Sequence, residues 1–417
     1  MLRLPVRAAA GFAPVERNPG AARGKTAPVV GRHDGMDFAL SDDEALIQKT
    51  VRELARGAIA ERAARLDRSG EFPAESMRDL AGLGMLGATI PERFGGSPIS
   101  KVAFNLMLEE LAWACASTSV TAAVHMSVAA TPIVEWGSPA VQQRFLPKLA
   151  TGEWIGCFAL TEPGAGSDVA ALATTAVKQG DHYVLNGSKV FITNGNHAGS
   201  AIVAAKTDPA AGHRGISLFA VEASWKGFGK DGHEDKLGLR ASDTARLSFT
   251  DLEVPKENLL GKPGDGFKQL MATLNGSRIS IGAQGVGIAQ RAFDEARAYA
   301  QERKQFGKPI AANQAIQWKL ADMDVRIEAA RLLYLKAAAA LDAGTLTPEM
   351  GSRAKLFASE TATWTAIQAV QIHGGNGYTT DYAVERLMRD AKVTEIYEGT
   401  SEVQRMVIAR AAGMGNG

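Results

Sequence analysis

The spacing of apolar residues changes twice along this chain of 417 residues, and those changes limit the possible folds most strongly. Over residues 36–155 apolar residues recur at helical spacing, with Gly and Pro between the segments. Over 156–263 short runs rich in Val, Ile and Phe alternate with turn residues, as in strands. Helical spacing returns over 264–417. The sequence predicts a mainly α fold with a central β domain: an N-terminal all-helical domain, a small β-barrel or sandwich, and a C-terminal four-helix bundle.

Capping signals mark the expected starts of two helices. Ser41 and Glu44 form a capping box ahead of the first helix, and Ser401 with Gln404 forms another ahead of the last one. Further N-terminal helices are predicted at 74–84, 101–117, 120–131 and 139–149. C-terminal helices are predicted from Gly266, over 313–341, from Pro348 to about Gly374, and over 382–389 and 402–411. Long helices joined by short loops are typical of an antiparallel bundle.

The middle part is predicted to contain strands near 201–205, 216–221 and 245–249. Asn186-Gly187 lies between the apolar runs Tyr183–Leu185 and Val190–Ile192. An Asn-Gly pair in that position is the signature of a β-hairpin turn, so we expect a hairpin there.

Residues 1–35 differ from the rest of the chain. They are rich in Arg, Gly, Pro and Ala and have no apolar periodicity. A segment of this kind buries too little surface to offset its ordering entropy. We therefore expect a disordered extension: either a targeting segment or the product of a translation start assigned too early, with Met36 as the true start.

Charge and cysteine content exclude several classes of protein. The 46 Lys and Arg residues nearly balance 45 Asp and Glu residues, so there is no broad basic surface for nucleic acid or an anionic membrane. Two cysteines exclude a disulfide framework and a cysteine-based zinc cluster, and they favour a reducing compartment. The uncharged stretch over 111–134 is long enough to span a bilayer. Its Ser, Thr, His and Pro residues favour a helix buried inside the protein instead.

Five segments carry residues suited to chemistry, although each has an ordinary structural explanation when taken alone. They cover residues 158–168, 191–194, 303–307, 371–377 and 395–402. In the first segment, Gly164 and Gly166 would let a ligand approach the backbone, and Thr161 and Ser167 supply hydroxyls. Their pattern matches neither of the usual glycine-rich phosphate motifs, so the alternative is a plain turn of small residues.

The other segments leave similar alternatives open. Glu398 lies in a non-helical link, where its carboxylate could be structural or could act as a general base. Phe191 could stack on a planar cofactor or belong to the core. The 371–377 glycines exceed what a helix C-cap needs, and His373 has no second metal ligand at a usual spacing, so no metal site is expected. The 303–307 cluster could be a charged surface or a phosphate contact. A hydrolase triad is not supported.

In this order the segments resemble the acyl-CoA dehydrogenase family, of the short-chain or short branched-chain type. The matching residues are Thr161–Asp168, Phe191–Thr193, Glu302–Gly307, Gln371–Gly377 and Ile396–Thr400. The resemblance covers about residues 38–412 and implies the same three-domain fold.

The resemblance also implies a reaction. In the family, a carboxylate removes the pro-R α-proton of an acyl-CoA, and the β-hydrogen leaves as hydride to N5 of FAD, which gives a trans-2-enoyl-CoA. By this resemblance Glu398 is the base, and desolvation should raise its pKa toward ~6–7. Hydrogen bonds to the thioester oxygen would stabilise the developing charge. Some members carry the base just before an Arg on the first bundle helix. Ser277 precedes Arg278 there, so that alternative base is absent.

The resemblance assigns binding residues one by one. For FAD they are Phe158, Leu160, Thr161, Gly166, Ser167, Phe191, Ile192, Thr193, Arg303, Gln314, Gln371, Gly374, Gly375, Thr400, Ser401 and Glu402. For the acyl-CoA substrate they are Ser167, Asn275, Arg278 and Gly399. Arg303 and Gln314 match contacts usually made across a dimer interface. Many members have Trp at the position of Phe191, so the aromatic wall is kept and an indole N–H is lost.

The implied partners are electron-transfer flavoprotein and further copies of the chain, in a homotetramer built as a dimer of dimers. The implied roles are fatty acid β-oxidation or branched-chain amino acid catabolism, in the cytoplasm of a bacterium or the mitochondrial matrix of a eukaryote. An acyl-CoA oxidase is the first alternative, although such oxidases usually carry a further C-terminal domain. Nitroalkane-oxidising relatives have Asp where this chain has Glu398. A nucleic-acid-binding flavoprotein is disfavoured by the net charge of +1.

Overall fold

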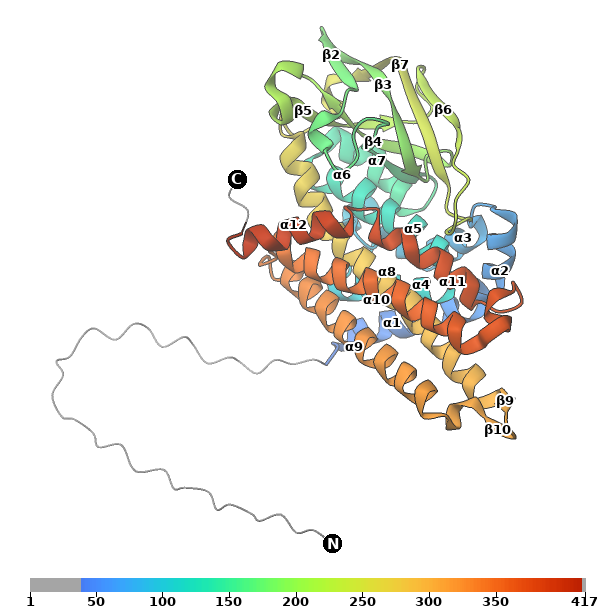
Figure 1. Cartoon of the computed structure of the whole chain (residues 1–417). Coiled ribbons are helices and arrows are strands. Elements are labelled where there is room, and N and C mark those ends of the chain that lie inside the picture. The colour runs from blue at the N-terminus through green and yellow to red at the C-terminus, as the bar shows by residue number, and fades with distance from the viewer. Residues whose placement is uncertain (1–38, 415–417) are drawn as a thin grey trace, which may run out of the picture. The chain divides into compact units, whose positions relative to one another are not determined.

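The computed structural model describes residues 39–414, and residues 41–414 form one compact unit. The predicted extension over 1–35 lies outside the described residues. Figure 1 shows the elements of the compact unit in chain order: helices, then a sheet, then helices again. The predicted fold class is therefore confirmed.

The N-terminal helical domain follows the predicted segments closely. Its helices are α1 (Asp42–Leu54), η1 (Ala55–Ile59), α2 (Ala60–Ser69), α3 (Ala74–Gly82), α4 (Lys101–Ala114), α5 (Ala116–Ala123), η4 (Val124–Ala130), α6 (Thr131–Trp136) and α7 (Pro139–Ala150). The first capping box is confirmed, because Glu44 N–H donates to Ser41 Oγ at 3.3 Å and Ser41 N–H donates to Glu44 Oε2 at 2.9 Å.

The uncharged stretch over 111–134 is not one helix. Cys115 adopts an extended backbone conformation between α4 and α5, and most residues of α5 and η4 are buried. Within residues 39–414, no helix has both the length and the apolar character needed to cross a membrane.

The middle domain is one twisted eight-stranded sheet. Its strands are β1 (Ile155–Ala159), β2 (Thr175–Gln179), β3 (His182–Thr193), β4 (Ala198–Lys206), β5 (Ile216–Glu222), β6 (Phe228–His233), β7 (Thr244–Pro255) and β8 (Leu259–Leu260). They lie in the order β6-β7-β3-β2-β4-β5-β8, and β1 pairs with β4 in parallel.

The hairpin predicted at Asn186-Gly187 is wrong. β3 continues through both residues, and its pairing with β7 shifts register between Leu185 and Gly187, which marks a β-bulge. The Asn186 amide bonds the Asp251 carboxylate on β7 at 3.1 Å. Gly187 is needed because a side chain there would overlap Thr174. The hairpin turn lies instead before β3, at Gly180, where β2 and β3 join as an antiparallel pair.

Within the described residues, the C-terminal helical domain has three long α-helices and two short ones. They are α8 (Gly266–Glu302), α9 (Gln314–Asp342), α10 (Pro348–His373), α11 (Val384–Lys392) and α12 (Ser401–Ala411). A small ribbon of β9 (Lys304–Gln305) and β10 (Lys308–Pro309) connects α8 to α9. Helix α4 of the N-terminal domain packs against α8 and α9, so the two helical domains share one core. The second predicted capping box is wrong: Thr400, not Ser401, is the N-cap, and its side chain accepts from Val403 N–H.

A polar junction joins all three domains beside α11. Arg389 pairs with Asp67 of α2 at 2.7 Å, and the neighbouring Asp390 accepts the backbone N–H of Leu239, in the β6–β7 connection, at 2.6 Å. Burial raises the pKa of Asp390 to about 6. These contacts fix the sheet against the helices that carry Glu398.

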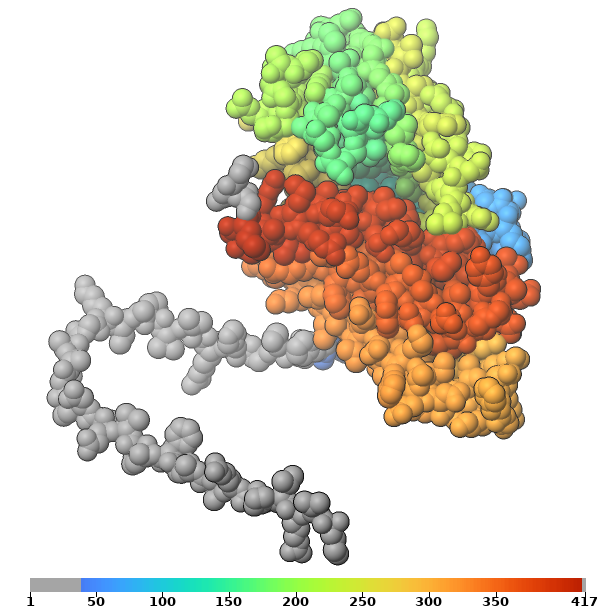
Figure 2. Space-filling model, viewed as in Figure 1, coloured from blue at the N-terminus to red at the C-terminus, as the bar shows by residue number. Residues whose placement is uncertain are grey.

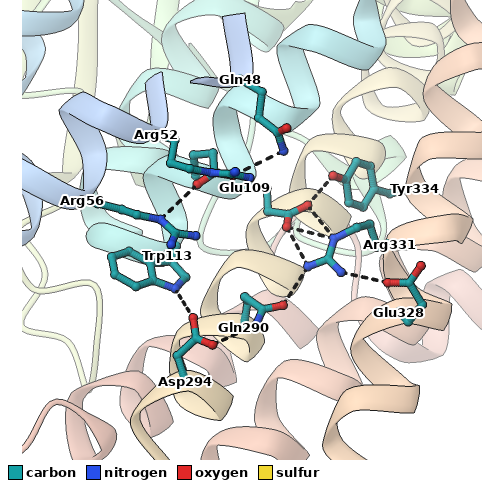
Figure 3. A network of polar contacts seen from close by, with 11 residues as sticks. Gln48, Arg52, Arg56, Glu109, Trp113, Gln290, Asp294, Glu328, Arg331 and Tyr334 are labelled. Atoms are coloured by element: carbon teal, nitrogen blue, oxygen red, sulfur yellow. Dashed lines mark hydrogen bonds and ion pairs between the residues drawn. The ribbon is translucent and has the colours of Figure 1, made fainter. Parts of the chain in front are cut away.

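Figure 3 shows a second polar network, where helices of the two helical domains meet. Glu109 of α4 is 6% exposed and accepts from Arg331 of α9 at 2.9 Å and from the Tyr334 hydroxyl. Gln290 of α8 accepts from the same arginine at 2.9 Å. Arg52 of α1 pairs with the adjacent Glu110 at 2.7 Å. The network therefore sets the register of four helices from two domains.

Removing Arg331 should destabilise the fold, because Glu109 would remain buried without its cation. We expect Arg331→Met to lower the free energy of unfolding by about 3 kcal/mol. The measurement is thermal unfolding of the purified protein. Arg297→Met is the matched control, since Arg297 is half exposed and pairs with Asp294 only at 3.6 Å; its effect should stay below about 1 kcal/mol. Equal melting temperatures for the two variants would contradict this account.

Candidate active site

Glu398 lies in a tight turn between the short helix η10 (Val393–Glu395) and α12. Its φ angle is +56° and that of Gly399 is +95°, so both residues adopt the left-handed backbone region. For a residue with a side chain this conformation costs of order 1–3 kcal/mol and persists only where surrounding contacts hold it. The Gln404 side-chain amide provides such contacts, donating to the carbonyl oxygens of Gly399 at 2.8 Å and Glu398 at 3.3 Å.

The Glu398 carboxylate faces Ser277, in the first third of α8. The Ser277 hydroxyl donates to Glu398 Oε2 at 2.6 Å. Burial raises the pKa of Glu398, and this effect outweighs the Ser277 hydrogen bond and the charges of Arg278 and Lys355, which act in the opposite direction. A carboxylate with a raised pKa, fixed in a constrained turn, has the properties of a general base.

Arg278 is a buried cation with an unused donor. It is 5% exposed, and one of its terminal nitrogens donates to Asn275 Oδ1 at 3.0 Å and Ser352 Oγ at 3.4 Å. Its Nε has no hydrogen-bond partner within residues 39–414. A buried donor left unpaired costs free energy, so it indicates a missing partner.

A chain of hydrogen bonds through α5 connects the Glu398 turn with the sheet. The Tyr397 hydroxyl bonds Gln284 of α8, whose amide donates to the Ala116 carbonyl at 3.0 Å. At the other end of α5, the Asn194 amide donates to the Thr121 carbonyl at 3.0 Å. Ala116 and Thr121 are about 7.5 Å apart along the helix axis. The end of β3 and the Glu398 turn are thus held at two ends of the same short helix.

On the sheet, two of the predicted cofactor segments lie side by side. Val190 N–H donates to the Thr161 carbonyl at 2.9 Å, which places Thr161 beside Phe191. The Phe191 ring is 64% exposed, and its φ angle is +58°. A large apolar side chain held exposed in a strained conformation offers a free aromatic face for a ligand. The core explanation for Phe191 is therefore wrong.

A buried ion pair between Lys189 and Glu162 connects the segment around Thr161 with the strand that carries Phe191. Lys189 is completely buried and donates to Glu162 at 2.7 Å and to the Leu160 carbonyl at 3.0 Å. Glu162 in turn accepts the backbone N–H of Thr174 at 3.0 Å. In the same loop, a side chain at Gly166 would meet no atom within 4 Å, so the backbone there is open to a ligand.

A second group of predicted cofactor residues lies at the opposite end of α8. These residues are exposed: Arg303, Gln314, Gln371, Gly374 and Gly375. The end of α10 meets the end of α8 through the stacked rings of Tyr299 and His373, 4.2 Å apart. The part of α8 from Ser277 to Tyr299 is about 33 Å long. The structure therefore does not bring this group together with Glu398 within one chain.

The glycines of the 371–377 segment have different explanations. Gly374 has a φ angle of +60° where α10 ends, and a side chain at Gly377 would overlap Val370. These two are explained by the fold. Gly375 has neither constraint and faces open space. His373 donates from Nδ1 to the Ala369 carbonyl at 2.8 Å, which gives it an ordinary structural role.

Lys355 of α10 is the functional candidate that the sequence analysis missed. It is fully buried, and its Nζ donates to the Gly399 carbonyl at 2.7 Å. The available signal was the helical face that it shares with Ser352 and Ser359, three residues before and four after it. A lysine that shares a helical face with two small polar residues is a weak sequence signal for a buried polar site.

The chain is similar to known proteins over nearly all of its described length. The family models for the N-terminal, middle and C-terminal domains of acyl-CoA dehydrogenase match residues 41–153, 157–252 and 264–413. The short-chain specific acyl-CoA dehydrogenase of Clostridium acetobutylicum is 47% identical over 374 residues, which cover 90% of this chain and 99% of that protein.

Two solved structures are also similar. Butyryl-CoA dehydrogenase from Megasphaera elsdenii aligns with a TM-score of 0.89 and 42% identity, over 90% of this chain and 100% of that one. A chain in a structure described as the electron transferring flavoprotein of Acidaminococcus fermentans aligns with a TM-score of 0.89 and 44% identity. The alignment covers 90% of this chain and 99% of that one. Matched in all three domains, the chain belongs to the acyl-CoA dehydrogenase family of FAD-dependent oxidoreductases.

Proposed function

We propose that this protein dehydrogenates a short straight-chain or short branched acyl-CoA at its α and β carbons, with Glu398 removing the α-proton. The observation that carries this proposal is the Glu398 carboxylate itself: burial raises its pKa, Ser277 orients it at 2.6 Å, and a left-handed turn fixes its backbone. The names of the Clostridium and Megasphaera relatives support a short acyl group.

The described residues fit FAD and a CoA thioester. We assign the flavin wall to Phe158–Ser167 and to Phe191–Thr193, and the neighbouring contacts to Thr400–Glu402. Ser401 Oγ is buried without a partner among residues 39–414, as is Arg278 Nε, and each is suited to a polar ligand atom. We assign Arg278, with Asn275, Ser167 and Gly399, to the acyl-CoA. When bound, FAD accepts the hydride that leaves the β-carbon.

A complete FAD site then requires two copies of the chain. Arg303, Gln314, Gln371, Gly374 and Gly375 lie about 33 Å away along α8 and would contact the FAD of a second copy. Phe306 and Tyr378, near this group, are 97% and 86% exposed, which suits a contact with that copy. On α9, Trp318, Val325 and Leu332 are exposed at seven-residue spacing, and we assign this stripe to a second interface in a dimer of dimers.

Electrons would pass from the reduced flavin to electron-transfer flavoprotein, in the bacterial cytoplasm or the mitochondrial matrix. The similarity to a chain in the Acidaminococcus electron transferring flavoprotein structure supports this partner. An oxidase that uses oxygen is the competing function.

Replacing Glu398 with Gln should abolish turnover while FAD and substrate still bind, because Gln is of equal size and cannot accept the proton. We expect kcat to fall at least about 10³-fold. The measurement is dye-coupled turnover, together with the FAD content of the purified protein. Glu253→Gln, an exposed glutamate on β7, is the matched control. Retained turnover in Glu398→Gln would mean that another residue is the base.

The acyl group can be identified by mixing the holoenzyme anaerobically with butyryl-, isovaleryl-, octanoyl- and palmitoyl-CoA. We expect rapid loss of flavin absorbance with one or both of the short substrates and slow loss with the long ones. Reoxidation in air should be slow, since a dehydrogenase protects its reduced flavin from oxygen. Preference for palmitoyl-CoA would overturn the short-chain assignment, and rapid peroxide formation would favour the oxidase.

The shared FAD site predicts an effect far from the base. Arg303→Ala should lower FAD retention in a protein that still dimerises, because it removes a cationic contact to a phosphate of the second copy's cofactor. FAD content after gel filtration, with mass measured by light scattering, gives the answer. Lys178→Ala, at an exposed site on β2, is the control. Unchanged FAD affinity in Arg303→Ala would contradict a site shared in this way.

A further inference from the structure

Lys355 stands out as a buried cation with no acidic partner. Its relative exposure is 0%, and no ion pair within 4 Å involves it in the part of the chain from 39 to 414. Its ammonium donates instead to the carbonyl oxygen of Gly399 at 2.7 Å. Burying a charge costs free energy unless an opposite charge or hydrogen bonds compensate it. A lysine in this position therefore costs free energy of folding, which indicates that it has a function other than stabilising the helix.

The contact is made at the turn that carries Glu398. The Gly399 carbonyl accepts from both Lys355 on α10 and Gln404 on α12, so two helices hold the peptide that follows the base. Because Glu398 and Gly399 both have positive φ angles, the turn would relax toward other conformations without such contacts. The double hydrogen bond thus maintains the position of the carboxylate.

The positive charge of Lys355 also acts on Glu398. It favours the ionised form of Glu398, together with Ser277 and Arg278 of α8. Lys355 in turn is attracted by Glu398, Glu395 and Glu402 and repelled by Arg278, while burial lowers its pKa to about 8. Lys355 is charged below that pH, so the carboxylate of Glu398 has a cation behind it in neutral solution.

We propose that Lys355 is a positioning residue for the dehydrogenation: it fixes the Glu398–Gly399 turn through the Gly399 carbonyl and keeps Glu398 ionised by its buried positive charge. This inference rests on the proposed function of Glu398 as the base. Lys355 itself touches neither the substrate nor the proton that is transferred. Its two roles are separable by measurement, because the titration midpoint of Glu398 reports the charge and the plateau rate reports the position of the base.

The test compares three variants as FAD-loaded proteins over a range of pH. Lys355→Met removes the charge and the hydrogen bond, Lys355→Gln removes the charge and keeps an N–H donor, and Gln404→Leu removes the other hydrogen bond without changing any charge. Lys178→Met, an exposed lysine on β2, is the control. kcat and KM for butyryl-CoA are measured with an artificial electron acceptor.

A second readout does not depend on activity. The infrared band of the protonated Glu398 carboxyl, assigned by its absence in Glu398→Gln, is titrated in the oxidised enzyme without substrate. Removing the cation should raise the pKa of Glu398, so the infrared band should persist to higher pH. On acidification, the reaction rate should likewise begin to fall at a higher pH than in the unmodified enzyme.

We expect both Lys355 variants to shift the midpoint of the band and the acid limb of kcat upward by about one pH unit. Lys355→Met and Gln404→Leu should lower kcat on the high-pH plateau by about 10–100-fold with KM changed less than about threefold, since a misplaced base affects the chemical step more than binding. Gln404→Leu should leave the midpoint unchanged. Lys178→Met should behave as the unmodified enzyme.

Unchanged midpoints and unchanged plateau kcat in the Lys355 variants would overturn the inference, provided that Glu398→Gln is inactive. Turnover by Glu398→Gln would overturn the proposed function instead. If Lys355→Met does not fold, Lys355→Gln decides the charge role, and Gln404→Leu shows whether loss of one of the two hydrogen bonds to the Gly399 carbonyl misplaces the base. A lower melting temperature without changes in kcat or midpoint would assign Lys355 to stability alone, and that also overturns the inference.

Discussion

The fixed turn at Glu398 is the constraint on which the rest of the site depends. A glutamate in the left-handed backbone region requires help from outside its own segment, and that help comes from Ser277 on α8, Lys355 on α10 and Gln404 on α12. Each of these helices is in turn fixed by the helical core. The position of one carboxylate therefore depends on the packing of most of the C-terminal domain.

The sheet is connected to the Glu398 turn by a separate set of hydrogen bonds. Asn194 at the end of β3 bonds to α5, and α5 bonds through Gln284 to the residue next to Glu398. At α11, Asp390 holds the β6–β7 connection and Arg389 holds α2. In Figure 2 the C-terminal helices in red border the sheet in green. An acyl group and a flavin ring can react only if the sheet and the C-terminal helices keep a fixed position relative to each other.

Much of this could be predicted from the sequence, and each failure has a physical reason. Helix positions followed from apolar spacing and from the capping box at Ser41, which are local signals. Asn186-Gly187 was misread because a tertiary contact, the pairing of β3 with β7, converts a turn signature into a bulge. Thr400 rather than Ser401 caps α12 because the cap depends on backbone angles, and Lys355 was missed because its acceptor lies 44 residues away in the chain.

Family resemblance, rather than spacing, predicts the roles of Glu398 and its neighbours. The most direct test is exchange of the α-hydrogen of butyryl-CoA with deuterated water in the enzyme with reduced flavin, followed by mass spectrometry. The account predicts rapid uptake of one deuterium with the unmodified enzyme and none above the uncatalysed rate with Glu398→Gln. Equal uptake by both proteins would show that Glu398 is not the base.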